Sequence, residues 1–117
     1  MANVLYGLKN THKVTLENIA QHTLSVKKGV KKSLLVVDMP KDSYKNVKIA
    51  KKNAKLIMNK TKCDALKLES NNKNFEIIKK LTDLKIPIMG HIGFTPQFKK
   101  KFKIEGKTNY EAKKLLL

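Results

Sequence analysis

Two carboxylates and an imidazole stand at the ends of three short apolar segments, where they could take part in catalysis. Asp38 ends the first segment, Glu69 ends the second, and His91 follows the third. If the segments are parallel strands, their carboxyl ends lie at one rim, which is where α/β folds bind ligands. Two carboxylates with open coordination positions suit a hard cation such as Mg²⁺, which polarises a bound carbonyl as a Lewis acid. The pattern therefore predicts a metal-assisted enzyme site.

Lys67 interrupts the second apolar segment two residues before Glu69, so both side chains point to the same face of a strand. An unpaired charge in a core is costly, so we expect Lys67 to pair with Asp38 and Glu69, where it could also hold a substrate carboxylate. Three simpler interpretations remain open. Asp38 could be a turn residue, Lys67 and Glu69 could form a solvent-exposed ion pair on an edge strand, and His91 could be a loop histidine.

The elements that would position these residues alternate along the chain. Alternating strands and helices imply right-handed crossovers and a parallel sheet. Three such strands alone leave two open edges, and a complete eight-fold barrel needs about 250 residues. We therefore expect residues 1–117 to be a single partial α/β barrel domain, truncated at both ends. The spacing predicts strands at 34–39, 65–69 and 86–90, helices at 15–28, 45–60 and 75–83, and a further helix starting at a capping box formed by Thr108 and Glu111.

The composition restricts the class of protein. The net charge is +17, but all 26 basic residues are lysine and they are spread along the chain. Arginine is favoured for phosphate and guanine contacts, so nucleic-acid binding is the less favoured alternative, and it predicts lysines gathered on one face. No apolar run is long enough to cross a membrane, and no secretory signal opens the chain. A single cysteine, Cys63, suits a reducing cytoplasm, where we expect it to be a small buried residue.

Five segments in order resemble one enzyme family. They are VTLENIAQHTLSVKKG, LLVVDMP, ALKLES, IPIMGHIGFTPQ and FKIEGKT, and they resemble ketopantoate hydroxymethyltransferase (3-methyl-2-oxobutanoate hydroxymethyltransferase). The resemblance implies a TIM (β/α)8 barrel, of which this chain supplies the third to fifth strands. It also implies transfer of a hydroxymethyl group from methylene-tetrahydrofolate to 3-methyl-2-oxobutanoate, giving ketopantoate for pantothenate (coenzyme A) biosynthesis. The full-length enzyme would be a cytoplasmic homo-oligomer acting on small molecules, with no nucleic-acid or membrane partner.

The resemblance also assigns roles to residues. It implies that Asp38 binds Mg²⁺ and the keto acid, that Glu69 binds Mg²⁺, that Lys67 binds substrate, and that His91 is an active-site residue. The family mechanism is Mg²⁺-assisted enolate chemistry. The family's Gly-Asp-Ser segment and its general base, a glutamate, have no counterpart here, so we expect the chain alone to be inactive. A second enzyme alternative is another Mg²⁺-dependent keto-acid barrel of the phosphoenolpyruvate or isocitrate lyase-like group.

Overall fold

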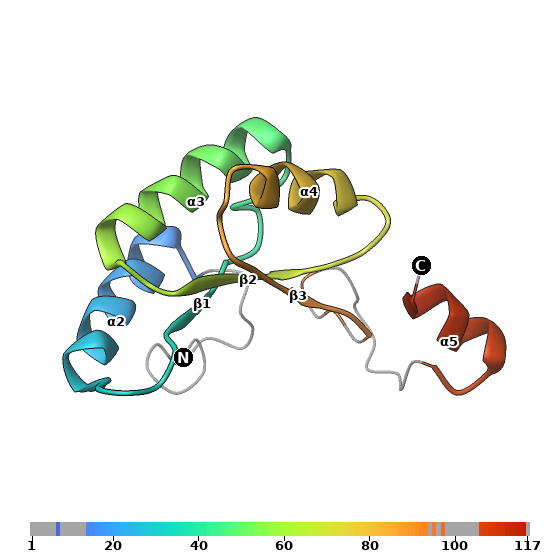
Figure 1. Cartoon of the computed structure of the whole chain (residues 1–117), viewed down its shortest axis with the longest axis horizontal. Helices are drawn as coiled ribbons and strands as arrows, with labels where there is room; N and C mark the ends of the chain where they lie inside the picture. The colour runs from blue at the N-terminus through green and yellow to red at the C-terminus, as the bar shows by residue number, and fades with distance from the viewer. Residues whose placement is uncertain (1–6, 8–13, 94, 96, 98–105, 117) are drawn as a thin grey trace.

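The fold is a three-stranded parallel sheet with helices packed against it (Figure 1). The structure, a computed structural model, describes residues 7, 14–93, 95, 97 and 106–116. The strands lie side by side in the order β1-β2-β3, as consecutive parallel strands do when each crossover is a helix. In chain order the elements are α2 (Leu16–Gly29), β1 (Val36–Asp38), α3 (Val47–Thr61), β2 (Ala65–Glu69), α4 (Phe75–Asp83), β3 (Ile88–His91) and α5 (Asn109–Leu116).

The three predicted strands and their parallel pairing are confirmed, but two of them have different bounds. β1 is shorter than predicted because the amide of Leu35 donates to the carboxylate of Asp64 at 2.7 Å rather than to a strand, and Leu34 is exposed. β3 begins two residues later than predicted and extends to His91. This extension matters for the site, because it places His91 within the sheet.

Helices α2, α3 and α5 begin where capping side chains satisfy their first amides, whereas Asn74 at the start of α4 makes no such bond. Thr15 accepts from the amide of Asn18, and the Asn18 side chain accepts from the Thr15 amide, which confirms the predicted start of α2. Asn46 caps α3 by accepting from the amide of Ile49 at 2.9 Å. At α5 the Thr108 hydroxyl accepts from the amide of Glu111 as predicted, while the Glu111 carboxylate accepts from the amide of Lys107.

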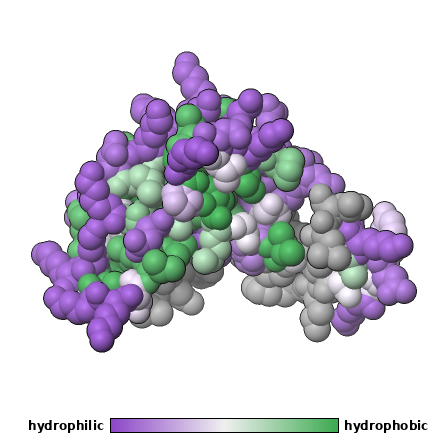
Figure 2. All heavy atoms as spheres, in the orientation of Figure 1, coloured by the Kyte–Doolittle hydropathy of each residue, from purple (hydrophilic) through white to green (hydrophobic). Residues whose placement is uncertain are grey.

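The core lies between the sheet and the helices that cover one of its faces. α3 and α4 lie over the same face, and α2 packs beside α3 (Figure 1). The buried stripe of α3 includes Ala50, Ala54 and Ile57, which belong to one core cluster with Leu66 and Leu68 of β2. Cys63 is also buried, as predicted. Figure 2 shows hydrophobic residues between the helices and the sheet and hydrophilic residues along the outer surfaces of the helices.

Lys27 of α2 caps the carboxyl end of α3. Its ammonium donates to the carbonyl oxygens of Thr61 and Lys62 at 2.9 and 2.6 Å. These carbonyls belong to the last turn of the helix and the residue that caps it, where the helix dipole attracts a cation. The contact therefore ties the two helices together at the end that leads into β2.

We expect Lys27→Met to lower the free energy of unfolding by about 1 kcal/mol, because it removes a cation from a helix carboxyl terminus while keeping the aliphatic stem. Urea denaturation followed by circular dichroism would measure the change. Lys28→Met is the matched control, since Lys28 is the exposed neighbour on the same helix and should leave stability within about 0.5 kcal/mol. Equal losses in both variants would contradict the capping role.

Candidate active site

The predicted site residues lie on the face of the sheet that α3 and α4 do not cover. Register pairs Asp38 of β1 with Lys67 of β2, and Glu69 of β2 with His91 of β3. Residues that alternate along a strand share a face, so these four side chains stand opposite the buried Leu66 and Leu68. The sequence prediction that Lys67 and Glu69 point the same way is therefore confirmed.

Asp38 and Lys67 form a direct ion pair. The ammonium of Lys67 lies 2.5 Å from Oδ2 of Asp38, with side chains 30% and 53% exposed for lysine and aspartate. β2 is the central strand, so the interpretation of an edge-strand ion pair is wrong, and Asp38 lies within β1 rather than in a turn. Lys67 is thus held against Asp38 on the face of the sheet opposite α3 and α4, with part of its side chain exposed to solvent.

Glu69 is the most enclosed of the four side chains, at 2% exposed. The backbone amide of Gln97 donates to both carboxylate oxygens, at 3.1 and 2.9 Å. Burial raises the pKa of Glu69 above its ordinary value and the charge of Asp38 adds to the rise, whereas the Gln97 amide and Lys67 oppose it. The charges of Asp38 and Glu69 therefore lie close enough to disfavour simultaneous ionisation of the two carboxyl groups.

Two residues to which the sequence assigned no role, Gln97 and Tyr44, form the support of Glu69. The Gln97 side chain donates from Nε2 to the carbonyl of Met39 at 3.1 Å, and its Oε1 accepts from the Tyr44 hydroxyl at 2.8 Å. The same hydroxyl lies 3.4 Å from the amide of Glu69. Burial raises the pKa of Tyr44, so this hydroxyl stays protonated and can donate. Gln97 belongs to the GHIGFTPQ segment, but a neutral amide gives no charge signal in a sequence.

His91 ends β3 beside Glu69, so the interpretation of a loop histidine is wrong. Its carbonyl accepts from the amide of Ser70 at 2.7 Å, which keeps the two strand ends in register. Its ring Nδ1 is buried, and within the described ranges it has no hydrogen-bond partner. A buried nitrogen of this kind is available to a bound molecule.

The donor set matches a hard divalent cation. Carboxylate oxygens are the ligands that Mg²⁺ takes from proteins, usually one or two of them together with waters and substrate oxygens. Asp38 and Glu69 can supply two such ligands from neighbouring strands. The residues that the structure describes contain no group of three or more His, Cys, Asp or Glu side chains placed to hold a metal, so the rest of the coordination shell would come from other groups.

We expect Glu69→Gln to raise the melting temperature of the chain at neutral pH in EDTA. Because the folded-state pKa of Glu69 is raised, the native state binds this proton more tightly than the unfolded chain does. Stability therefore falls as pH rises through the ordinary glutamate pKa toward the raised value, and a neutral amide removes that loss. The advantage of the variant should disappear in acid. Thermal denaturation at several pH values would measure it.

Glu17→Gln is the control with the opposite sign. Lys60, 2.7 Å away, is the main cause that lowers the pKa of Glu17, and Gln21 adds to it. Its contribution to stability is present above the ordinary glutamate pKa and is lost as pH falls through the lowered value. The control variant should melt slightly lower at neutral pH. A lower melting temperature for Glu69→Gln as well would contradict the desolvation of Glu69.

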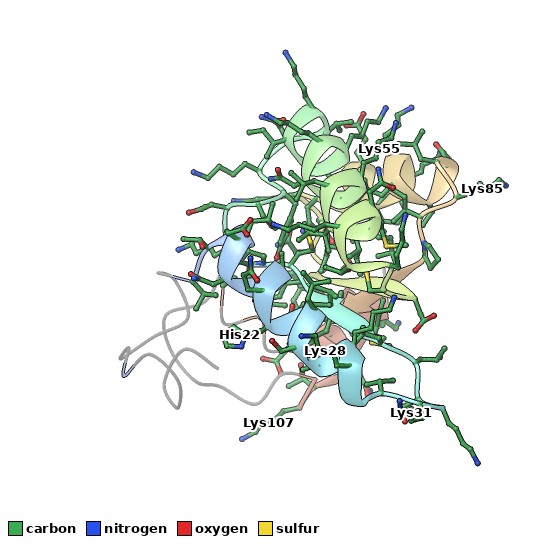
Figure 3. All side chains as sticks on the ribbon, turned by 90° about the vertical axis from the view of Figure 1, so that its left-hand side faces the viewer. His22, Lys28, Lys31, Lys55, Lys85 and Lys107 are labelled. Atoms are coloured by element: carbon green, nitrogen blue, oxygen red, sulfur yellow. The ribbon has the colours of Figure 1, made fainter. Side chains whose placement is uncertain are left out.

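Lysines occur on several sides of the described part of the molecule. Lys28, Lys31, Lys55, Lys85 and Lys107 point to different sides of the molecule (Figure 3). Within the described part of the chain, no helix combines the length and apolar character needed to cross a bilayer.

Comparison with known proteins points to one family. A sequence model described as ketopantoate hydroxymethyltransferase matches residues 1–117. The chain is 52% identical over 116 residues to the 3-methyl-2-oxobutanoate hydroxymethyltransferase of Pelagibacter ubique, covering 99% of the chain and 45% of that relative. The proteins of that name from Clostridium botulinum and Aquifex aeolicus are 43% and 40% identical, over 97% and 98% of the chain and 42% and 45% of their own lengths. The chain therefore spans less than half the length of these relatives.

Proposed function

The chain belongs to the ketopantoate hydroxymethyltransferase family, and we propose that it forms part of an enzyme that transfers a hydroxymethyl group from methylene-tetrahydrofolate to 3-methyl-2-oxobutanoate. The product, ketopantoate, would serve pantothenate biosynthesis. The observation that carries the proposal is the placement of Asp38, Lys67 and Glu69 together on the face of the sheet opposite α3 and α4. A keto acid has an anionic carboxylate that Lys67 could bind and a carbonyl that a metal held by Asp38 and Glu69 could polarise.

The proposed fold of the complete protein is a (β/α)8 barrel in which β1, β2 and β3 are the third to fifth strands. The parallel order β1-β2-β3 and the cover of α3 and α4 on one face support it, because barrel helices lie outside and strand ends form the catalytic rim. We expect the complete enzyme to be a homo-oligomer. The single cysteine, which is free and buried, is compatible with the cytoplasm as its location.

Each site residue has a proposed role. Asp38 and Glu69 would hold Mg²⁺, which when bound supplies Lewis-acid polarisation of the keto oxygen. The ammonium of Lys67, which now pairs with Asp38, would donate to the substrate carboxylate and orient the keto acid against the rim. His91, which has a buried Nδ1 and lies on the same face of the sheet as Glu69, would hydrogen-bond a reacting group. Removal of the substrate proton needs a further base that these four residues do not supply.

A chimaera tests this proposal. This chain would replace the matching 116-residue segment of the Pelagibacter ubique relative, which is 52% identical to it. Purified chimaera, given both substrates and Mg²⁺, should form ketopantoate, detected by mass spectrometry. The 117-residue chain assayed alone should form none, because Asp38 and Glu69 are its only proposed metal ligands and the family's general base has no counterpart in this sequence. A folded chimaera without transfer activity, beside an active Pelagibacter ubique parent, would refute the proposal.

A further inference from the structure

Gln97 joins the ends of two strands that carry the proposed metal ligands. Its backbone amide donates to both oxygens of Glu69, and its side-chain Nε2 donates to the carbonyl of Met39, the residue that follows Asp38. One residue thus contacts the carboxylate on β2 and the backbone beside the carboxylate on β1. The pairing of β1 with β2 sets the register of Asp38 and Glu69, and Gln97 adds a second link between the two strands beside both carboxylates.

Tyr44 fixes the remaining freedom of the Gln97 side chain. Its hydroxyl donates to Oε1 of Gln97 at 2.8 Å, so the amide oxygen has a donor while the amide nitrogen faces the Met39 carbonyl. The ring of Tyr44 is 4% exposed. With donor and acceptor each satisfied by one partner, the amide group has a single orientation.

We propose that Gln97, oriented by Tyr44, is a positioning residue that sets the distance between Asp38 and Glu69 and so sets the affinity of the site for a divalent cation. The inference rests on the proposed function, and it names residues that act on the carboxylates without touching the cation. Loss of a group that orients a metal ligand typically lowers metal affinity by about 10–100-fold. A role in stability alone would leave metal affinity unchanged in a variant that still folds.

The test is direct binding of Mn²⁺ to the chimaera, followed by the loss of the free-ion signal in electron paramagnetic resonance. Mn²⁺ takes the same oxygen ligands as Mg²⁺ and is visible by this method. Gln97→Met removes both side-chain hydrogen bonds at similar length, and we expect its dissociation constant to rise about tenfold. The Mg²⁺ concentration for half-maximal transfer should rise in parallel, with little change in KM for methylene-tetrahydrofolate.

Gln21→Met is the matched control, because within the described residues the side chain of Gln21 bonds only to Glu17, on the exposed face of α2, and its loss should leave Mn²⁺ affinity unchanged. Tyr44→Phe is the second variant, used if Gln97→Met fails to fold. It removes one hydroxyl, keeps the ring, and should weaken Mn²⁺ binding by a smaller factor.

The outcomes separate the two proposals. Parent-like Mn²⁺ affinity in folded Gln97→Met, or in Tyr44→Phe where that variant replaces it, would overturn the positioning role and leave the proposed function standing. A chimaera that catalyses transfer but binds no Mn²⁺ would also overturn the positioning role. Absence of both transfer and Mn²⁺ binding in the unmodified chimaera, with an active Pelagibacter ubique parent, would overturn the proposed function and the inference that rests on it.

Discussion

Asp38→Asn in the chimaera should lower kcat/KM for hydroxymethyl transfer by about 10²–10³-fold, the effect of removing one preorganised electrostatic group from a catalytic site. Asparagine keeps the size of the side chain and loses its charge. The Asp38 carboxylate pairs with Lys67, with 2.5 Å between Oδ2 and Nζ, and it would also bind the metal. Its loss therefore weakens two interactions at once. Initial rates at several Mg²⁺ and keto-acid concentrations would separate a loss of metal affinity from a loss of kcat.

Asp42→Asn is the control for that experiment. Asp42 is four residues away, exposed, and forms an ion pair with Lys45 at 3.5 Å outside the site. Its φ of 72° lies in the left-handed region, which asparagine tolerates as well as aspartate does, so the backbone should not change. The control should keep its rate. Activity in Asp38→Asn within twofold of the parent would show that Asp38 has no catalytic role.

Lys67→Met should raise KM for 3-methyl-2-oxobutanoate by about 10–100-fold, the cost of a hydrogen bond to a charged group. Methionine keeps much of the stem inside the sheet and removes the ammonium. The unmodified enzyme should prefer the keto acid strongly over its neutral methyl ester, and the variant should lose much of this preference. Steady-state kinetics with both compounds would measure the difference.

Measurements of unfolding separate a role of Lys67 in substrate recognition from a role in stability. Both members of the Lys67–Asp38 pair are partly exposed, so breaking the pair should change the free energy of unfolding by no more than about 1 kcal/mol. Lys60→Met, which breaks the surface pair with Glu17, is the matched control and should leave KM unchanged. Unchanged discrimination between acid and ester in Lys67→Met would refute carboxylate recognition.

Local patterns predicted most of the fold. Short apolar runs predicted the three strands. Helical spacing, together with capping residues such as Thr15, predicted the helices on either side of them. The ends of β1 and β3 were less predictable because hydrogen bonds from outside the strands decide them. Asp64, for example, takes the Leu35 amide that would otherwise be free to pair with a strand.

Only the titratable residues of the candidate site were predicted from the sequence. Asp38, Lys67 and Glu69 stand out because charged residues are unusual in apolar strands, and the structure brings them to one face. Gln97 and Tyr44 do not stand out, because their importance comes from contacts between distant segments. The burial of Glu69 is equally invisible in the sequence, since it depends on contacts such as that with Gln97, which is 28 residues away in the chain.

The bonds made by Gln97 also bear on the order in which the protein assembles. Gln97 is 58 residues from Met39 and 53 from Tyr44, whereas neighbouring strands and helices close shorter stretches of chain. Contacts that close long loops of chain form late in folding, and the ribosome synthesises the amino-terminal part of the chain first. The sheet can therefore pair β1 with β2 before Gln97 has emerged. During that interval the paired strands carry both carboxylates without the hydrogen bonds that Gln97 makes to Glu69 and Met39, so tight metal binding would report the completion of folding rather than its start.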